Sequence, residues 1–382
     1  MASGLVRRLV GRVRWGLCGW VFACVWASCV WVSWGCSASA QERYVVVDQD
    51  ASGPAGSDMT ALLVFLQSPQ VKLLGITVVT GDAWRDEEVA HTLRLLELIG
   101  RTDVKVYAGA EYPLVRTQQE TSLSESLYGK SAWKGAWKDG GHGATVIPQM
   151  PEGLPTTKAA DEDAAHFMIR MVHQYPHQVT IYGGGPLTNI ALAIRLDSHF
   201  AELAKGLVVM GGSLNPQTED EEFLNDPHHE FNFWFDPEAA SITLRAPWAE
   251  IVDTTVDVSI ETRPTAKMMA DWAKLDSAAA RYLTKYSKHP VGSYLWDELA
   301  AAAWLDPSMI TRERVVLMDV NTTHGPGYGD TLIWNEKDRP AVIALRKVRA
   351  QMDVDFPKLE KDLGELLAKP APGETNPLMP LK

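Results

Sequence analysis

The chain has 382 residues, of which 46% are hydrophobic and 22% are charged, as in ordinary globular proteins with a sizeable core. Its formal net charge of −12 argues against nucleic acid or an anionic membrane as the main partner, because both carry negative charge. An acidic chain is compatible with a small neutral substrate and a bound cation.

The first forty residues, here called the leader, have the pattern of a signal peptide. Basic residues up to Arg14 precede an apolar run over 15–35, and Ala38-Ser39-Ala40 is a small-residue cleavage motif. We expect cleavage after Ala40 and export to the periplasm or the cell exterior. Two alternatives stay open. The apolar run is near the length of a membrane span, so it could remain as an anchor, and Cys36 could carry a lipid.

All four cysteines lie in the leader. The rest of the chain therefore uses no disulfide, thiolate nucleophile or cysteine-ligated metal. Because four of the 36 basic residues and none of the 48 acidic ones are in the leader, the rest carries a net charge of about −16.

After the leader, expected strands alternate with expected helices. The strands are expected at 44–48, 71–80, 104–107, 179–182, 206–210 and 249–253, and the helices at 59–66, 87–99, 164–173, 187–194, 236–244, 296–305 and 356–368. This order predicts an α/β fold with an open, mostly parallel twisted sheet flanked by helices. We expect one catalytic domain over 41–369, a tail over 370–382, and a long segment of weak periodicity over 112–155.

Three carboxylates follow the first expected strand. Asp48 and Asp50 are two residues apart, so both are expected to face the crevice where open α/β sheets bind ligands. Asp58 begins the next helix at the same edge. Such carboxylates repel one another unless a cation is present, and calcium prefers oxygen ligands. Alternatively, Asp50 or Asp58 only caps a helix.

Later candidates also follow strand ends. The backbone of Gly184, within a glycine run, could approach a ligand closely. Glu230 and Asn232 suit recognition of hydroxyl groups. Asp297 could be a further carboxylate ligand, and Trp296 beside it could stack on a planar base. Each also has a purely structural explanation as a turn, a surface strand, a helix cap or a core side chain.

Taken in order, these motifs resemble those of the calcium-dependent nucleoside hydrolase family, from Tyr44 to about Leu367. They are Asp48-x-Asp50…Asp58, Gly185-Pro186-Leu187-Thr188-Asn189, Met210-Gly211-Gly212, Glu230-Phe231-Asn232, Asp236-Pro237-Glu238-Ala239-Ala240 and Asp297…Asp306-Pro307. The resemblance implies an enzyme that hydrolyses the N-glycosidic bond of a ribonucleoside to free base and ribose, with Ca²⁺ as its cofactor.

The resemblance also implies roles for individual residues. Asp50 would ligate calcium and act as general base on a calcium-bound water. Further ligands would be Asp58, Asp297 and the carbonyl of Gly184, and Asp48 would support this cluster. Glu230 and Asn232 would bind the 3′ and 5′ hydroxyls of the sugar.

The chain departs from the family pattern mainly at the sugar contacts. Ser57 stands where the family has an acid that touches the 2′ hydroxyl, and Asp82 stands where it has an asparagine. Leu224 replaces another asparagine, with Asn225 one place out of register. Asp82 and Asn225 are therefore candidate substrate-binding residues. The departures leave open a secreted nucleoside- or sugar-binding protein without turnover. A metal-dependent phosphatase with the Asp-x-Asp motif is a further alternative.

The group that activates the leaving base differs among family members. Trp296 before Asp297 resembles the purine-preferring members, which favours a purine nucleoside. Side chains for the opposite stacking face could come from the long segment, at Tyr128, Trp133 or Trp137. Candidate general acids are His142, His228 and His229. We expect a small nucleoside or ribosyl substrate, no nucleic acid partner, no membrane contact beyond the leader, and a homo-oligomer.

Overall fold

The computed structural model describes residues 42–287 and 293–373. They belong to one compact unit, Gln41–Lys382. The leader predicted over 1–40 and most of the predicted tail, residues 374–382, lie outside the described residues. Among the described helices, none combines the length and apolar character needed to cross a membrane.

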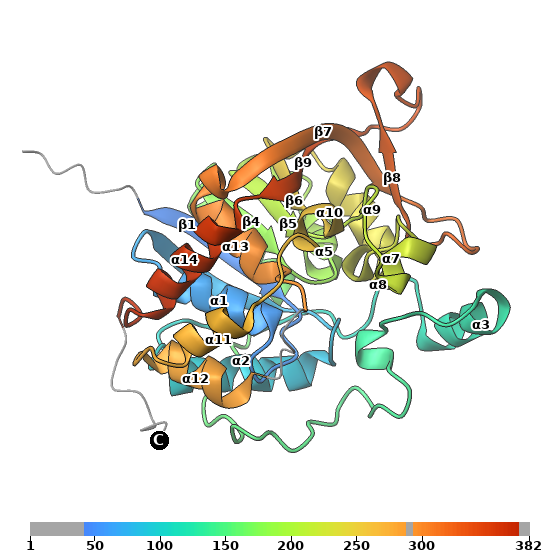
Figure 1. Ribbon diagram of the computed structural model, residues 1–382. Helices are drawn as coiled ribbons and strands as arrows, with labels where there is room; N and C mark the ends of the chain where they lie inside the picture. The colour runs from blue at the N-terminus through green and yellow to red at the C-terminus, as the bar shows by residue number, and fades with distance from the viewer. Residues whose placement is uncertain (1–41, 288–292, 374–382) are drawn as a thin grey trace, which may run out of the picture. The chain divides into compact units, whose positions relative to one another are not determined.

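A nine-stranded sheet runs through the centre of this unit (Figure 1), in the order β3-β2-β1-β4-β5-β6-β9-β7-β8. The strands are β1 Arg43–Gln49, β2 Val71–Val78, β3 Val106–Ala108, β4 Val179–Gly183, β5 Gly206–Met210, β6 Ile251–Thr254, β7 Ile310–Val320, β8 Thr331–Trp334 and β9 Arg346–Val354. Strands β1 to β6 and β9 pair in parallel, and β7 and β8 continue the sheet antiparallel. The predicted open, mostly parallel α/β sheet is confirmed.

Helices cover both faces of the sheet. The α-helices are α1 Ser57–Gln67, α2 Arg85–Leu98, α3 Gln118–Tyr128, α4 Ala164–Gln174, α5 Thr188–Leu196, α6 Phe200–Leu203, α7 Glu221–Asn225, α8 Phe231–Phe235, α9 Pro237–Arg245, α10 Val256–Ser259, α11 Ala266–Trp272, α12 Ala278–Tyr286, α13 Asp297–Leu305 and α14 Phe356–Leu367. Short 3₁₀ turns are η1 Gly135–Trp137, η2 Pro307–Met309 and η3 Glu336–Asp338.

Each face of the sheet has its own hydrophobic core, because successive side chains of a strand point to opposite faces. Val45 and Val47 of β1 pack in one core with apolar residues of α1, α2 and α11 to α14. Val46, between them, packs in the other core with α4, α5 and α9. Within the first core α1 packs directly against α13. The first residues of these two helices therefore approach the same edge of the sheet.

The order of strand addition reverses at β1, and this reversal positions the site. From β1 the chain adds β2 and β3 on one side, and later adds β4, β5 and β6 on the other. Such a reversal opens a crevice outside the carboxyl ends of two neighbouring strands. Here the strands are β1 and β4, whose register pairs Asp48 with Gly183. Asp50 and Gly184, just beyond these strand ends, therefore lie at the crevice.

Two parts of the fold differ from the sequence-based expectation. The long segment over 112–155 contains α3 and η1, although it was expected without regular structure. The only buried residue of α3 is Thr121, so this helix has no apolar face for a periodic pattern to reveal. The strands β7 to β9 form a second unpredicted feature. Half of β7 is exposed, which weakens the alternation that would mark it as a strand.

The cap of α9 is a buried polar junction that joins three segments of the chain. Asp236 is fully buried, and its carboxylate accepts hydrogen bonds from Ala239 N, Leu114 N and Thr188 Oγ1. We expect Asp236→Ala to lower the free energy of unfolding by about 3 kcal/mol, because three buried donors lose their acceptor. Asp163→Ala, at the exposed cap of α4, is the control and should cost about 1 kcal/mol. Urea unfolding of both variants measures the difference, and equal losses would contradict this reasoning.

Candidate active site

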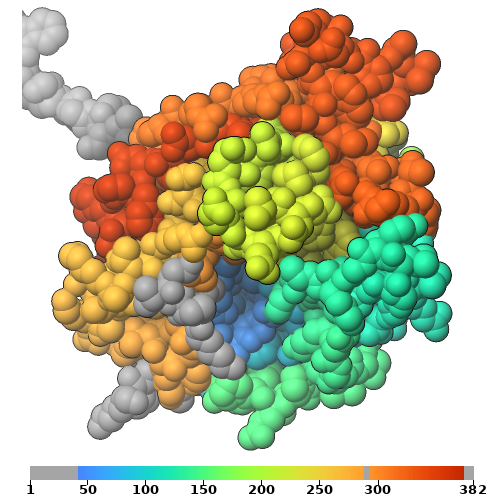
Figure 2. All heavy atoms as spheres, turned by 45° about the vertical axis from the view of Figure 1, so that its right-hand side comes forward, coloured from blue at the N-terminus to red at the C-terminus, as the bar shows by residue number. Residues whose placement is uncertain are grey.

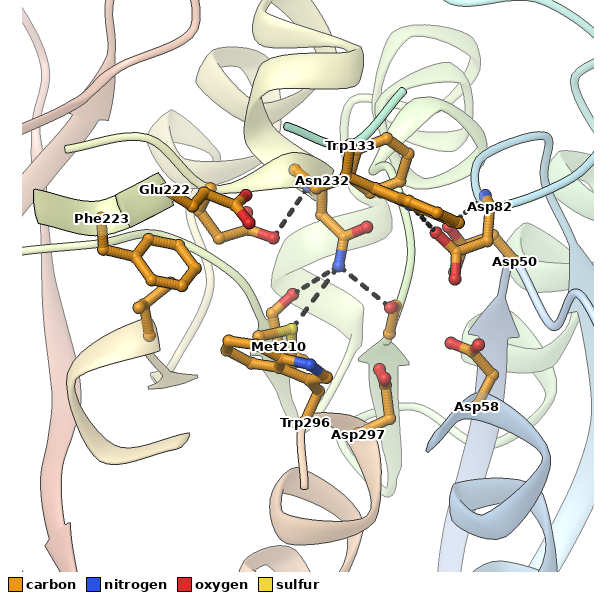
Figure 3. Close-up of a pocket in the computed structure, with 14 residues that line it drawn as sticks. Asp50, Asp58, Asp82, Trp133, Met210, Glu222, Phe223, Asn232, Trp296 and Asp297 are labelled. Atoms are coloured by element: carbon orange, nitrogen blue, oxygen red, sulfur yellow. Dashed lines mark hydrogen bonds between the residues drawn. The ribbon is translucent and has the colours of Figure 1, made fainter. Parts of the chain in front are cut away.

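A cavity of about 220 Å³ opens at the reversal of strand order. Figure 2 shows a hollow with blue atoms of the first described residues on its floor. The yellow-green segment before α8 and the green-teal long segment stand on its sides. Eight of the predicted site residues line it: Asp50, Asp58, Asp82, Gly184, Glu230, Asn232, Trp296 and Asp297. They come from segments far apart in the sequence and face one space in Figure 3.

The acidic side of the cavity is built by strand ends and helix starts. Asp50 follows β1, Asp58 lies in the first turn of α1, and Asp297 is the first residue of α13. Asp82 N donates to Asp50 Oδ2 at 3.0 Å, and Gln49 Nε2 donates to Asp58 Oδ1 at 2.8 Å. These bonds fix two of the carboxylates with their charges close together.

Burial is the main cause of the unusual acidity of these groups. It raises the pKa of Asp50 and of Asp58 well above the usual value, and repulsion from neighbouring carboxylates raises both further. The pKa of Asp297 rises to about 8, again mainly through burial and then through Glu298. In Asp297, buried Oδ1 has no hydrogen-bond partner among the described residues. Full ionisation of the cluster is therefore unfavourable without a compensating cation, and one buried oxygen is unsatisfied.

This donor set fits a hard divalent cation, although its side chains do not form a closed ligand shell as they stand. Over 42–287 and 293–373, no group of three or more His, Cys, Asp or Glu side chains is arranged to hold a metal ion. Asp58 Oδ1 accepts a hydrogen bond from the amide of Gln49. The carboxylate oxygens and the Gly184 carbonyl are nevertheless the ligand type that calcium takes, and the orphaned oxygen of Asp297 lacks only such a partner.

Glu230 and Asn232 lie beside this cluster, not on a strand but at the start of α8. Glu230 is the N-cap of α8, and its carboxylate accepts from the backbone N–H groups of Asn232, Phe233 and Gly212. Burial raises its pKa to about 7. Asn232 Nδ2 donates to the carbonyls of Gly184 and Met210, both at 3.1 Å. Both residues thus line the cavity while also holding its walls together.

Asp82 and two tryptophans form the rim. Asp82 Oδ1 accepts from Trp133 Nε1 at 2.6 Å, and burial raises the pKa of Asp82 to about 6. Trp133 and Trp296 both line the cavity, from opposite sides in Figure 3. Of the other stacking candidates, Trp137 stacks on Phe235 with 4.4 Å between ring centroids, and Tyr128 is exposed at the end of α3. The long segment thus brings one of its three candidate aromatic residues to the cavity.

Asp48 and Asn225 are not among the residues that line the cavity, so Asn225 is not where it was expected, and support of the acidic cluster by Asp48 stays a prediction. Asp48 Oδ1 accepts from Thr77 Oγ1 at 2.6 Å and from Asn189 Nδ2 at 2.8 Å, while its buried Oδ2 has no hydrogen-bond partner among the described residues. Asn225 is exposed on α7 and donates to Glu221 O. Asn225 is the last residue of α7, where its side chain is exposed.

The three candidate histidines also lie outside the cavity. His142 Nε2 is 3.0 Å from Glu87 Oε2, and His228 Nδ1 is near Ser213 O. His229 is buried, and this burial lowers its pKa to about 4. Ser57, in place of an acid, donates to Glu298 and accepts from Asp297 N at 2.9 Å, so it joins α1 to α13.

Sequence reasoning missed part of the cavity wall. Glu222 and Phe223 of α7, together with Met210, Phe231 and Val256, line it as well. The sequence signal for this wall is the polar segment that follows Gly212 and contains α7. Glu88 is a further missed acid: it is buried beneath the cluster and raises the pKa of Asp50 by repulsion, after burial and Asp82.

The fold and the acidic cavity at the strand reversal are those of an α/β enzyme with an oxygen-rich site. The family model for inosine-uridine preferring nucleoside hydrolase matches residues 45–359. The chain therefore belongs to this family and is a hydrolase that acts on N-glycosyl bonds of nucleosides. This assignment speaks against both alternatives, the phosphatase and the binding protein without turnover.

Some of the known proteins similar to this chain are named for pyrimidine nucleosides, and others are named for purine nucleosides. A probable uridine nucleosidase of Arabidopsis thaliana is 28% identical over 79% of this chain and 89% of its own length. A pyrimidine-specific ribonucleoside hydrolase of Salmonella newport is 29% identical over 68% of this chain and 79% of its own. The structure of a purine-preferring ribonucleoside hydrolase from Gardnerella vaginalis has a TM-score of 0.66 at 25% identity, covering 85% of this chain and 98% of that one.

The glycine after the β4 strand end leaves the space that Asp50 occupies. A Cβ atom on Gly185 would lie 2.7 Å from Asp50 Cγ. We expect Gly185→Ala to displace the Asp50 carboxylate and to lower kcat for nucleoside hydrolysis about 100-fold, because small misplacements of a reacting group have effects of this size. The control is Gly143→Ala, whose Cβ would meet nothing within 4 Å. Steady-state release of free base measures both, and unchanged turnover in Gly185→Ala would contradict the placement of Asp50.

Proposed function

We propose that the protein hydrolyses a ribonucleoside, with a preference for purines, to free base and ribose, and that Asp50 is the general base. The observation that carries this proposal is the convergence of Asp50, Asp58 and Asp297 on one cavity at the strand reversal. We further propose that the reaction takes place outside the cytoplasm, because the leader has the pattern of a signal peptide.

Asp50, Asp58, Asp297 and the Gly184 carbonyl would hold a calcium ion, which when bound would lower the pKa of a coordinated water and bind sugar hydroxyls. Asp50 takes the proton from the attacking water, and the Asp82 N–H keeps its carboxylate in place. The neighbouring carboxylates stabilise the positive charge of an oxocarbenium-like transition state at the anomeric carbon.

The purine preference rests on the aromatic walls. Trp296 lies beside the acidic cluster, and Trp133 lies on the other side of the cavity in Figure 3. A large planar base gains more from stacking on such rings than a small one. Two of the similar proteins are named for uridine or for pyrimidine nucleosides, so a preference for pyrimidines is the competing outcome.

A panel of purine and pyrimidine ribonucleosides, incubated with the protein and calcium, tests the reaction and the role of Asp50. We expect equal amounts of free base and ribose from the wild type, with a higher kcat/KM for inosine than for uridine. Asp50→Asn should lower kcat on the order of 10³-fold, because it removes the general base. Asp338→Asn, at an exposed aspartate of η3, is the matched control and should be unaffected.

Three results would count against this proposal. A wild type that binds nucleosides without releasing base would favour the binding protein. Full turnover by Asp50→Asn would remove its assigned role, and a higher kcat/KM for uridine would refute the purine preference.

Removing divalent cations tests the proposed cofactor independently of turnover. We expect chelator-treated protein to regain activity with Ca²⁺. Ca²⁺ at about 100 times its Kd should stabilise the fold by about 2.7 kcal/mol, because it binds the folded state only. Asp297→Asn should reduce this stabilisation strongly. Thermal unfolding with and without Ca²⁺ measures it. If Ca²⁺ does not change the Tm of the wild type, and the protein remains active after chelation, calcium is not its cofactor.

A further inference from the structure

The helix α3 stands apart from the two hydrophobic cores. In Figure 1 it lies at one edge of the molecule, away from the central sheet, and Thr121 is its only buried residue. A helix of 11 residues is marginal in water when no apolar face of it packs against a neighbour. A contact with another molecule would therefore supply stability that α3 lacks within its own chain.

The leucines of α3 point away from the rest of the protein. Leu123 and Leu127 lie one turn apart on the same face of the helix, and their exposed fractions are 60% and 63%. Thr121 and Glu125, whose side chains are covered, lie on the opposite face, because successive residues of a helix are rotated by about 100°. The outer face of α3 therefore carries an exposed apolar stripe, formed by Leu123 and Leu127.

The sequence around this stripe is self-complementary. If two α3 helices pack antiparallel about a two-fold axis level with residue 125, Leu123 of each copy lies opposite Leu127 of the other. Glu120 and Lys130 lie equally far in sequence on either side of this axis, so the same packing brings their opposite charges together. A surface that pairs with a copy of itself needs this kind of symmetry. A second copy of the chain therefore fits the outer face of α3.

An anionic membrane is a less suitable partner for the same face. Helices that lie on membranes carry lysine or arginine beside their apolar side chains. Here Glu120 precedes Leu123 by one turn, and the chain has a formal net charge of −12. Both charges disfavour a surface of anionic lipids.

Hydrogen bonds connect α3 to the cavity. Glu125 Oε1 accepts from Ser131 N at 3.1 Å, and its Oε2 accepts from Lys134 Nζ at 3.0 Å. Between these two donors lies Trp133, which lines the cavity and donates from Nε1 to Asp82 Oδ1 at 2.6 Å. A contact that fixes α3 therefore also restricts the segment that carries Trp133.

We propose that α3 is the docking surface for a second copy of this chain, and that this contact holds Trp133 of each copy at its cavity. The helix is about 16 Å long, so the interface is smaller than the standard size and the dimer is weak. Each leucine occurs twice in a two-fold interface, so a single substitution changes two contacts. The effect on turnover rests on the proposed nucleoside hydrolysis.

Sedimentation velocity over a range of protein concentrations tests the docking surface. We expect the wild type to change from monomer to dimer with a Kd on the order of 10 µM, as for a small interface. Leu123→Glu should raise this Kd about 30-fold or more, because two apolar contacts are lost and two charges enter the interface. The matched control is Leu196→Glu, at an exposed leucine of α5, which should keep the wild-type Kd.

A charge exchange tests the antiparallel arrangement. Lys130→Glu should raise the Kd about 3- to 10-fold, because it places two acidic groups opposite each other at both ends of the interface. Adding Glu120→Lys restores opposite charges and should return the Kd to within about threefold of the wild type. Both residues also have partners within their own chain, so the rescue, and not the single loss, is the decisive result.

Rapid-quench assays below and above the Kd test the link to Trp133. We expect kcat/KM for nucleoside hydrolysis to be about threefold or more higher in the dimer, with Leu123→Glu resembling the diluted wild type at all concentrations. An equal kcat/KM for monomer and dimer would refute this link. If the wild type cleaves no nucleoside, the proposed function fails, and sedimentation still tests α3.

Two results would overturn the docking surface itself. One is a wild type that stays monomeric at about 100 µM, well above the Kd expected for a small interface. Flotation of that monomer with phosphatidylglycerol vesicles would then assign the stripe to a membrane. The other is dimerisation of Leu123→Glu with the wild-type Kd, which would place the interface elsewhere on the protein.

Discussion

The repulsion among carboxylates buried at the carboxyl ends of β1 and β4 is the constraint on which the site depends. Burial raises the pKa of Asp50, Asp58 and Asp297, and each group makes ionisation of the others harder. Such a cluster weakens a fold unless something positive compensates it. The surrounding contacts hold the carboxylates in place: α1 packs on α13, Ser57 joins their first residues, and Gln49 holds Asp58.

The two hydrophobic cores explain how the fold keeps this arrangement. One core ties β1 to α1 and α13, and so fixes two of the acids relative to the strand that carries the third. The other core ties β1 and β4 to α5 and α9, whose first turns share the buried carboxylate of Asp236 through Thr188 and Ala239. The contacts that pack helices on the strands therefore also fix the positions of the acids that line the cavity.

Most of the parallel sheet and of the acidic site could be predicted, because both follow from local patterns. Apolar runs mark the buried strands, and acids or glycines directly after them fall at one edge. Prediction failed where tertiary contacts decide. Asn225 lies exposed on α7 instead of at the cavity, and α3 lacks a buried apolar stripe. Glu222 was missed because an acidic residue in a polar insertion is indistinguishable, in sequence, from a solvated one.

The wall formed by α7 belongs to a connection between β5 and α8, not to the sheet. Residues can be inserted, removed or exchanged in such a connection without disturbing either core, because strand pairing does not depend on it. This part of the cavity wall is thus encoded apart from the strand ends and helix starts that carry the acidic cluster. A lineage that carries this fold can diversify what it degrades while its reacting groups stay the same.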